Sequence, residues 1–494
     1  MLKRYFSSGR VVCLLANSRK ADRIGAQLMS DLKQVSGNSI KFIGSGGEGM
    51  IKEGITPLYN TDMFHPKPMV PFRTAWIEEN NWWVWSKRNP MTKSYTKPMS
   101  EVLAYISKNQ IIDKIAGFRP SVVLTLDHDQ LSFRIHRQIA QLYGKTNLSR
   151  PKQVHYGNFV NKYQPYQLSY LDHVLYTMPL EPINWNKFKM PSTYIGQSAF
   201  EETCRFLLSR NGGDHLLTEN SIFMNKDHFY SEMDQYIEAE RNTFREKFGI
   251  AKDATVLFLA PGSLESEIAW SLPILNKTAN AFIDEYAAPF SKRSDAIPVE
   301  KFVVVIPTTE KTKAYVSERV NIQGWKCRVQ IVDTCENRKS AMAGSDLAIC
   351  YNGDIVTECF VNQLSTIVIQ NMKKMEFYCL LAWNRFTNDM NIIGDGNLFP
   401  EIIEGQCHPP KLMQILTQWH ESPPHKFWPL QQMEMYLNKM LPIKKMDMGM
   451  GTHHEYFSPR LLAAKTVYEF AQLNPAREFP ENENVFIKNL VGNQ

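Results

Sequence analysis

The residues best suited to chemistry stand where apolar, strand-like runs end. Asp127 and Asp129 follow the run at 121–126, and Gly262 and Ser263 follow the run at 255–260. A glycine-serine turn at the start of a helix can hold a phosphate on its backbone amides. A strand-end aspartate followed by a histidine is typical of chemistry and of a helix cap alike.

The cysteines and histidines do not indicate a metal site. The eight cysteines are scattered and form no C-x-x-C pair, and the twelve histidines include no H-E-x-x-H pattern. Several cysteines lie within apolar runs, so we expect buried, reduced thiols. We expect neither a metal nor a bound cofactor.

Length and composition predict a compact α/β protein with more than one domain. The chain has 494 residues, of which 43% are hydrophobic and 21% charged, so a disordered or fibrous chain is excluded. No apolar run approaches the roughly 20 residues that cross a bilayer. The net charge of +6 is small and is spread without a block of like charges, which argues against a dedicated nucleic-acid site.

Strand-like runs alternate with helix-like segments in two series. Such alternation predicts parallel sheets covered by helices on both faces, that is, two Rossmann-like, doubly wound lobes. The first series comprises 11–16, 40–43, 121–126, 153–156 and 173–177, and the second 255–260, 302–306, 328–332, 347–351 and 365–369.

The predicted organisation has five parts. They are a tail at 1–10, a first lobe at 11–197 with an insertion at 64–98, a linker or insertion at 198–245, a second lobe at 246–430 and a methionine-rich helical tail at 431–494. The basic, acid-free tail is typical of a mitochondrial targeting segment or of a basic surface tail. Trp82, Trp83 and Trp85 in the insertion are either local core or a partner-docking surface.

Motifs along most of the chain resemble those of the lipid-A-disaccharide synthase family. They include ANSRKADRIGA at 16–26, FIGSGGEGMIKEG at 42–54, MPLE at 178–181, LAPGS at 259–263 and NGDIVTE at 352–358. The resemblance implies a GT-B-like fold, two lobes facing a cleft, and metal-free transfer of an acylated glucosamine from a UDP-sugar to a lipid-linked acceptor. It also implies Asp127 or Asp129 as the general base. The nucleotide-sugar would be held by Gly262, Ser263, Asn352, Gly353 and Glu358.

Several polar groups of that family are replaced in this chain. Leu264 stands where the family has an arginine for the departing diphosphate, and Asp354 stands where it has a hydroxyl residue. Gln130 and Gln197 replace a second aspartate and a histidine, and the acceptor-side signature is missing after 155–156. Leucine cannot offset developing negative charge. The substitutions therefore predict that this chain keeps the fold of the family but has lost its transfer chemistry.

Two functions from different classes follow. The first is a non-catalytic structural or accessory subunit that binds protein subunits of a large mitochondrial complex, namely the respiratory chain, the ATP synthase or the mitoribosome. It would work in the matrix or on the matrix side of the inner membrane, with peripheral membrane contact left open. The alternative is an active UDP-sugar-dependent inverting glycosyltransferase that makes a lipid-A-like disaccharide. A nucleotide-sugar or phospholipid sensor without turnover is a third hypothesis.

Overall fold

The protein is described here by a computed structural model. It describes residues 10–16, 19–60, 106, 110–126, 129–145, 149–157, 169–178, 190–218, 221–225, 229–371, 386–394, 396–421, 440–441, 443–447 and 452–473. The chain divides into two compact units. Unit 1 comprises Met1–Gly196 and Ser458–Gln494, and unit 2 comprises Gln197–Phe457.

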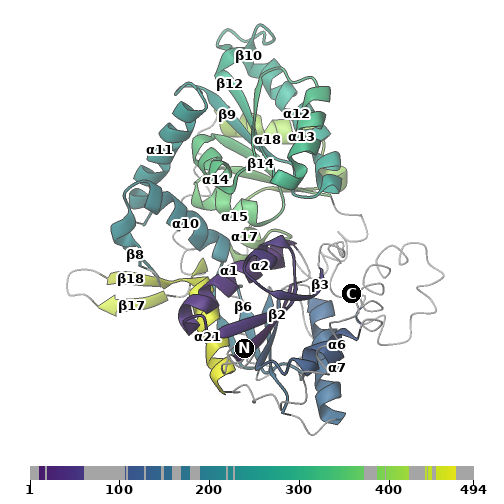
Figure 1. Cartoon of the computed structure of the whole chain (residues 1–494). Helices are drawn as coiled ribbons and strands as arrows, with labels where there is room; N and C mark the ends of the chain where they lie inside the picture. Colours follow the sequence, from purple (N-terminus) through teal and green to yellow (C-terminus); the bar gives the residue numbers. More distant parts are fainter. Residues whose placement is uncertain are drawn as a thin grey trace, which may run out of the picture. The chain divides into compact units, whose positions relative to one another are not determined.

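Unit 1 is built on a seven-stranded sheet in which all strand pairs are parallel (Figure 1). In sheet order the strands are β3 (Thr56–Asn60), β2 (Ile40–Gly46), β1 (Arg10–Ala16), β4 (Val122–Leu126), β5 (Lys152–Gly157), β6 (His173–Tyr176) and β7 (Ser192–Tyr194). The predicted strands of the first series are confirmed. Arg10, which we had placed in the tail, begins β1.

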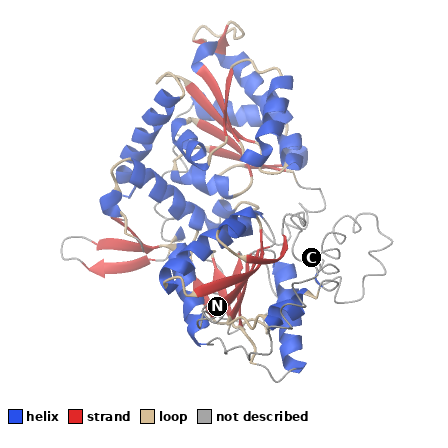
Figure 2. Ribbon diagram, viewed as in Figure 1, coloured by secondary structure: helices blue, strands red, loops and turns tan. Residues whose placement is uncertain are grey.

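The central strands of this sheet are apolar along most of their length. Because successive strand residues point to opposite sides, both faces of the sheet are apolar. On one face, Leu14 and Leu124 pack with α1 (Arg19–Ser36) and α21 (Pro459–Leu473). On the other, Cys13 and Val123 pack with α6 (Ile111–Gly117) and α7 (Asp129–Lys145). Unit 1 is therefore doubly wound, as the alternating pattern predicted (Figure 2). The short helix α2 (Glu48–Lys52) follows β2.

The last described helix belongs to the first unit. α21 lies against α1, its Ala463 and Val467 are fully buried in the core, and Arg460 pairs with Asp31 at 3.2 Å. The predicted tail at 431–494 is therefore not one part: residues up to 457 belong to unit 2 and the helix returns to unit 1.

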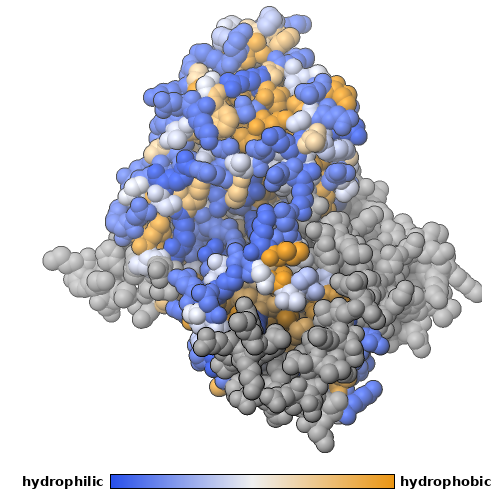
Figure 3. Space-filling model, viewed as in Figure 1, coloured by the Kyte–Doolittle hydropathy of each residue, from blue (hydrophilic) through white to orange (hydrophobic). Residues whose placement is uncertain are grey.

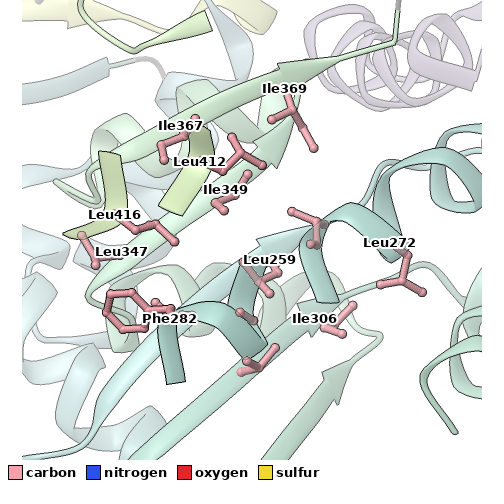
Figure 4. Close-up of a cluster of buried hydrophobic side chains, with 14 of the residues drawn as sticks. Leu259, Leu272, Phe282, Ile306, Leu347, Ile349, Ile367, Ile369, Leu412 and Leu416 are labelled. Carbon is pink, nitrogen blue, oxygen red and sulfur yellow. The ribbon is translucent and has the colours of Figure 1, made fainter. Parts of the chain in front are cut away.

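Unit 2 contains a six-stranded parallel sheet. In order it comprises β13 (Arg328–Val332), β12 (Phe302–Pro307), β9 (Thr255–Ala260), β14 (Leu347–Tyr351), β15 (Thr366–Gln370) and β16 (Glu401–Ile403). One face packs against α12 (Glu265–Tyr286), α13 (Glu310–Ile322) and α18 (Pro409–Glu421). Figure 4 shows this core, in which Phe282 and Leu416 meet the strand residues Leu347 and Ile349.

The segment predicted as a linker at 198–245 is part of unit 2. It forms α10 (Ser198–Arg210), β8 (Ser221–Asn225) and most of α11 (Phe229–Lys247). Helix α10 packs against α15 (Asp354–Val361), and α11 packs against α14 (Cys335–Gly344). Arg245 explains the attachment: its guanidinium donates to Asp346 and to the carbonyls of Gly344 and Ala254 at 3.0–3.1 Å. A buried arginine with this many acceptors fixes α11 to the sheet.

Smaller elements complete unit 2. β8 forms an antiparallel sheet with β18 (Thr452–Phe457), which also pairs with β17 (Ile443–Asp447). The remaining elements are β10 (Ala287–Ala288), β11 (Ile297–Pro298) and α17 (Asp389–Gly394). None of the described helices is long and apolar enough to cross a bilayer.

The described cysteines are free thiols, but not all of them are buried as we expected. Cys335 is exposed at the first turn of α14, and Cys327 is half-buried. The other described thiols are buried, and those of Cys350 and Cys359 lie 3.7 Å apart. Burial raises the pKa of Cys350 well above its ordinary value, so this thiol stays protonated.

Candidate nucleotide site of unit 2

The predicted nucleotide-binding residues meet at the point where the strand order of unit 2 reverses. β9 and β14 are neighbours, with Ala260 opposite Cys350, while the chain leaves β9 toward β12 and leaves β14 toward β15. Ligands of doubly wound sheets bind at the carboxyl ends of the strands at this reversal. Gly262 and Ser263 follow β9, and Asn352 and Gly353 follow β14, so the structure brings the two predicted turns together.

In the β9 turn the backbone amides already have an anionic partner. Glu267, in the first turn of α12, accepts hydrogen bonds from the amides of Ser263 at 2.8 Å and Leu264 at 3.0 Å. Gly262 has a φ of +112°, and a Cβ there would lie 2.6 Å from the Cβ of Glu267. The glycine is thus required by the packing of Glu267, and the carboxylate takes the donors that we predicted for a phosphate.

Asn352 is committed to a network of side chains from neighbouring loops. Its amide nitrogen donates to Gln370 at 3.0 Å and to the Thr387 carbonyl at 3.2 Å, and its amide oxygen accepts from Asn388 at 2.9 Å. Glu401 holds the same loop by accepting from the amides of Thr387 and Asn388 at 2.8 and 3.0 Å. Both donor hydrogens of Asn352 are therefore used within the protein.

Glu358 on α15 is buried and paired with an arginine. Only 1% of the residue is exposed, and its Oε1 accepts from Nη2 of Arg338 on α14 at 3.1 Å. The Arg338 side chain is itself 19% exposed. A polar ligand would have to reach this buried position and share the carboxylate with Arg338.

The start of α15 leaves space but offers a negative charge. Gly353 has an extended backbone, and a Cβ there would meet no atom within 4 Å. Asp354 is the first residue of the helix, where a phosphate would compete with its carboxylate. At the corresponding position beside β9, Leu264 carries no charge.

The two catalytic candidates of unit 1 follow β4 in the sequence. Asp127 lies outside the described residues. Asp129 begins α7, with its side chain outside the description. The strand before them is well defined, because β4 ends at Leu126 beside β1, where the strand order of unit 1 reverses. Trp82, Trp83 and Trp85 also lie outside the described residues, so their docking role stays a prediction.

The glycine-rich segment of unit 1 is organised by Asp22. Its carboxylate accepts from the amides of Gly47 at 2.7 Å, Gly49 at 3.0 Å and Met50 at 3.0 Å. A Cβ at Gly47 would lie 2.8 Å from the Asp22 carboxylate. Because these glycines have no Cβ, they leave room for the Asp22 carboxylate, just as Gly262 leaves room for Glu267.

A buried chain of hydrogen bonds connects β4, α7 and β5 near the end of β4. Thr125 Oγ1 lies 2.8 Å from His136 Nε2 and 2.6 Å from His155 Nδ1, and His136 Nδ1 lies 2.8 Å from Gln153 Oε1. Because the Gln153 oxygen only accepts, His136 carries its proton on Nδ1 and His155 donates to Thr125. Burial lowers the pKa of His136 to about 3, so this imidazole is neutral.

Sequence reasoning assigned no structural role to three residues that define these sites. Glu267 has a recognisable signal, because a glutamate three residues after a helix N-cap is typical of capping. Asp22 and Arg338 reach partners 20–28 residues away. No local pattern marks such contacts, which depend on the tertiary fold.

Two doubly wound, parallel-sheet units with a final helix that returns to the first unit define a GT-B-like class of protein. Residues 231–422 match the family model for lipid-A-disaccharide synthetase. A lipid-A-disaccharide synthase from Rhodospirillum centenum is 22% identical over 84% of this chain and 86% of its own length. A probable mitochondrial lipid-A-disaccharide synthase from Arabidopsis thaliana is 22% identical over 93% of this chain and 91% of its own. Over most of its length the chain is therefore similar to lipid-A-disaccharide synthases.

Solved structures are also similar to this chain. A UDP-GlcNAc 2-epimerase from Neisseria meningitidis bound to UDP-GlcNAc has a TM-score of 0.47 at 12% identity, covering 87% of this chain and 99% of the other. MurG from Acinetobacter baumannii has a TM-score of 0.43 at 10% identity, covering 87% and 98%.

Proposed function

We propose that this chain is a non-catalytic member of its family and serves as a structural or accessory subunit of a large mitochondrial assembly. The observation that carries the proposal is that the polar groups at the strand reversal of unit 2 are committed to internal partners. Glu267 occupies the amides of the β9 turn, and Arg338 occupies Glu358. A UDP-sugar would have to displace these contacts and would meet no compensating cation at Leu264.

The missing cation matters most for the transferase reaction. Departure of UDP develops negative charge on the diphosphate, and removing one donor that stabilises such charge typically costs about 3 kcal/mol or more. In this chain the side chain of Leu264 supplies no donor, and the Asp354 and Glu267 carboxylates add negative charge to the same turns. Repulsion and lost stabilisation act together against both binding and turnover.

A mitochondrial location is supported by two independent features. The segment at 1–10 contains Lys3, Arg4 and Arg10 and no acidic residue, which is typical of targeting segments. The Arabidopsis thaliana relative is named as mitochondrial. We place the chain in the matrix or on the matrix side of the inner membrane, with protein subunits of the respiratory chain, the ATP synthase or the mitoribosome as partners.

Fractionation of native mitochondrial extract by size tests this role. The polypeptide of 57.1 kDa should elute with a particle several times larger, together with the same set of proteins through a second, orthogonal separation. Elution mainly at the monomer mass would overturn the subunit role.

Active transfer from a UDP-sugar is the second candidate function. It is favoured by the names of the relatives and by the retention of Gly262, Gly353 and Glu358. Purified protein incubated with a UDP-acylglucosamine and a lipid-linked monosaccharide phosphate would then release UDP. We expect no release above that of a sample lacking the acceptor.

A further inference from the structure

The two units carry opposite net charges. Unit 1 contains 30 Lys and Arg residues and 17 Asp and Glu residues, a net charge of +13, whereas unit 2 contains 26 and 33, a net charge of −7. The modest total of +6 hides this difference, and we had expected the charge to be spread evenly. A charge of this size on one unit generates a field that attracts and orients an anionic partner.

Helix α7 concentrates positive charge on its outer side. Leu131, Ile135 and Ile139 pack into the core of unit 1, so the opposite side of the helix faces outward. Arg134, Arg137 and Lys145 lie within about 80° of one another on that side, since each residue turns the helix by about 100°. The stripe runs about 16 Å along the helix at 1.5 Å per residue.

The sequence of α7 contains few acidic residues. The only acidic residue of α7 is Asp129, at its first position. Arg137 and Lys145 are exposed, and among the described residues neither forms an ion pair. Arg137 also adds to burial in lowering the pKa of Arg134, which is the effect of one positive charge on another.

Two further cations, both half-buried, lie near α7. Lys114 lies on α6, which packs against α7, and Arg119 follows α6 and acts electrostatically on Tyr143 of α7. One acidic residue, Asp113, is exposed on α6. We define the α7 basic face as the exposed Arg137 and Lys145 together with the half-buried Arg134.

We propose that the α7 basic face docks an acidic surface of a partner protein. This inference rests on the proposed function and names the surface through which the chain joins its assembly. Complementary charge fixes the orientation of two proteins and speeds their encounter. The α7 basic face fits an acidic patch of limited size, because only one face of unit 1 has to approach such a patch.

Two other anionic partners fit the same surface less well. These partners are a membrane surface and a nucleic acid, both of which extend well beyond one helix. None of the described, strongly exposed large hydrophobic residues lies on α7. The face thus offers no side chain to insert into lipid or to stack on bases, as stable anchoring and single-strand binding require. Elsewhere, the described surface in view in Figure 3 is mostly hydrophilic, with smaller apolar areas.

A charge-reversal pair tests the proposal in the native assembly. The variant Arg137→Glu/Lys145→Glu should lower the fraction of the chain in the large particle at least about tenfold, because like charges then face each other. The matched control, Lys277→Glu/Lys411→Glu, changes the same number of exposed charges in unit 2 and should assemble as the wild type does. Circular dichroism and urea unfolding of both variants verify that they fold.

A second measurement identifies the partner chemically. Zero-length carbodiimide coupling of the wild-type assembly should join Lys145 to an Asp or Glu of another protein. Photocrosslinking of α7 to RNA in the native particle, or flotation of the purified chain with phosphatidylcholine vesicles containing phosphatidylglycerol, would overturn the protein partner. Full assembly of the reversed variant would also overturn this inference while leaving the subunit role intact. A wild-type chain found only as a monomer contradicts the subunit role itself.

Discussion

The guanidinium of Arg338 lies 3.1 Å from the carboxylate of Glu358, and Glu358 is 1% exposed. The two residues belong to α14 and α15, the helices that precede and follow β14 along the chain. Their pairing removes from solvent a carboxylate that stands at the reversal of the unit 2 sheet. The pair therefore contributes to the stability of unit 2 and engages one of the residues that we predicted to hold a nucleotide.

Removing Arg338 should destabilise unit 2. The substitution Arg338→Met leaves Glu358 buried without its cation, and breaking a buried pair in this way costs about 3–5 kcal/mol. Urea unfolding should report this loss, and the double variant Arg338→Met/Glu358→Met should recover most of it. A single variant within about 1 kcal/mol of the wild type would show that the pair contributes little.

Asp22 should be needed to order the glycine-rich segment of unit 1. Asp22→Ala removes the acceptor for three backbone amides, which should cost about 2–4 kcal/mol, and Asp22→Asn should cost less because one oxygen remains. Hydrogen exchange should show faster exchange at Gly47 and Gly49 in the alanine variant. Unchanged protection of these amides would contradict the capping role.

The close approach of β1 and β2 makes Gly44 irreplaceable. Its φ is +140°, and a Cβ would lie 1.8 Å from the carbonyl oxygen of Leu14. Gly44→Ala should therefore prevent folding or cost more than about 4 kcal/mol. Gly37→Ala is the matched control, because Gly37 has a φ of +59° with no atom within 4 Å of a Cβ; it should cost about 1 kcal/mol. Equal losses in the two variants would disprove the steric explanation.

The buried histidine predicts a loss of stability in acid. The pKa of His136 is about 3 in the folded protein and near 6.5 when unfolded, so between these values only the unfolded chain binds the proton. Stability should fall as the pH drops through that window, by about 5 kcal/mol in total from this residue. His136→Gln should flatten the dependence measured by urea unfolding between about pH 4 and 7. An unchanged slope would show that His136 does not cause it.

The sequence was sufficient for the sheets because their signal is local. Runs such as 121–126 and 302–306 are apolar on both faces, as buried parallel strands must be, and β4 and β12 lie there. The roles of single polar residues were less accessible. Gly262 suggested a phosphate turn, but the structure shows that its space is filled by Glu267. The space beside Gly47 is likewise filled by Asp22.

The predicted linker failed for a related reason. Residues 198–245 are polar on average, which is typical of a connection between domains. Their attachment depends on Arg245 and Asp346, which are 101 positions apart. Contacts at such separations leave no periodic pattern in the sequence.

Calorimetric titration of the purified chain with UDP and UDP-N-acetylglucosamine tests the central claim most directly. Our account predicts no saturable heat at millimolar ligand and no rise in the unfolding temperature, because Glu267 and Arg338 already occupy the groups that a nucleotide would need. Binding with a Kd of about 10 μM would instead stabilise the protein by about 2.7 kcal/mol at 1 mM ligand. That result would contradict a closed site and favour an active transferase.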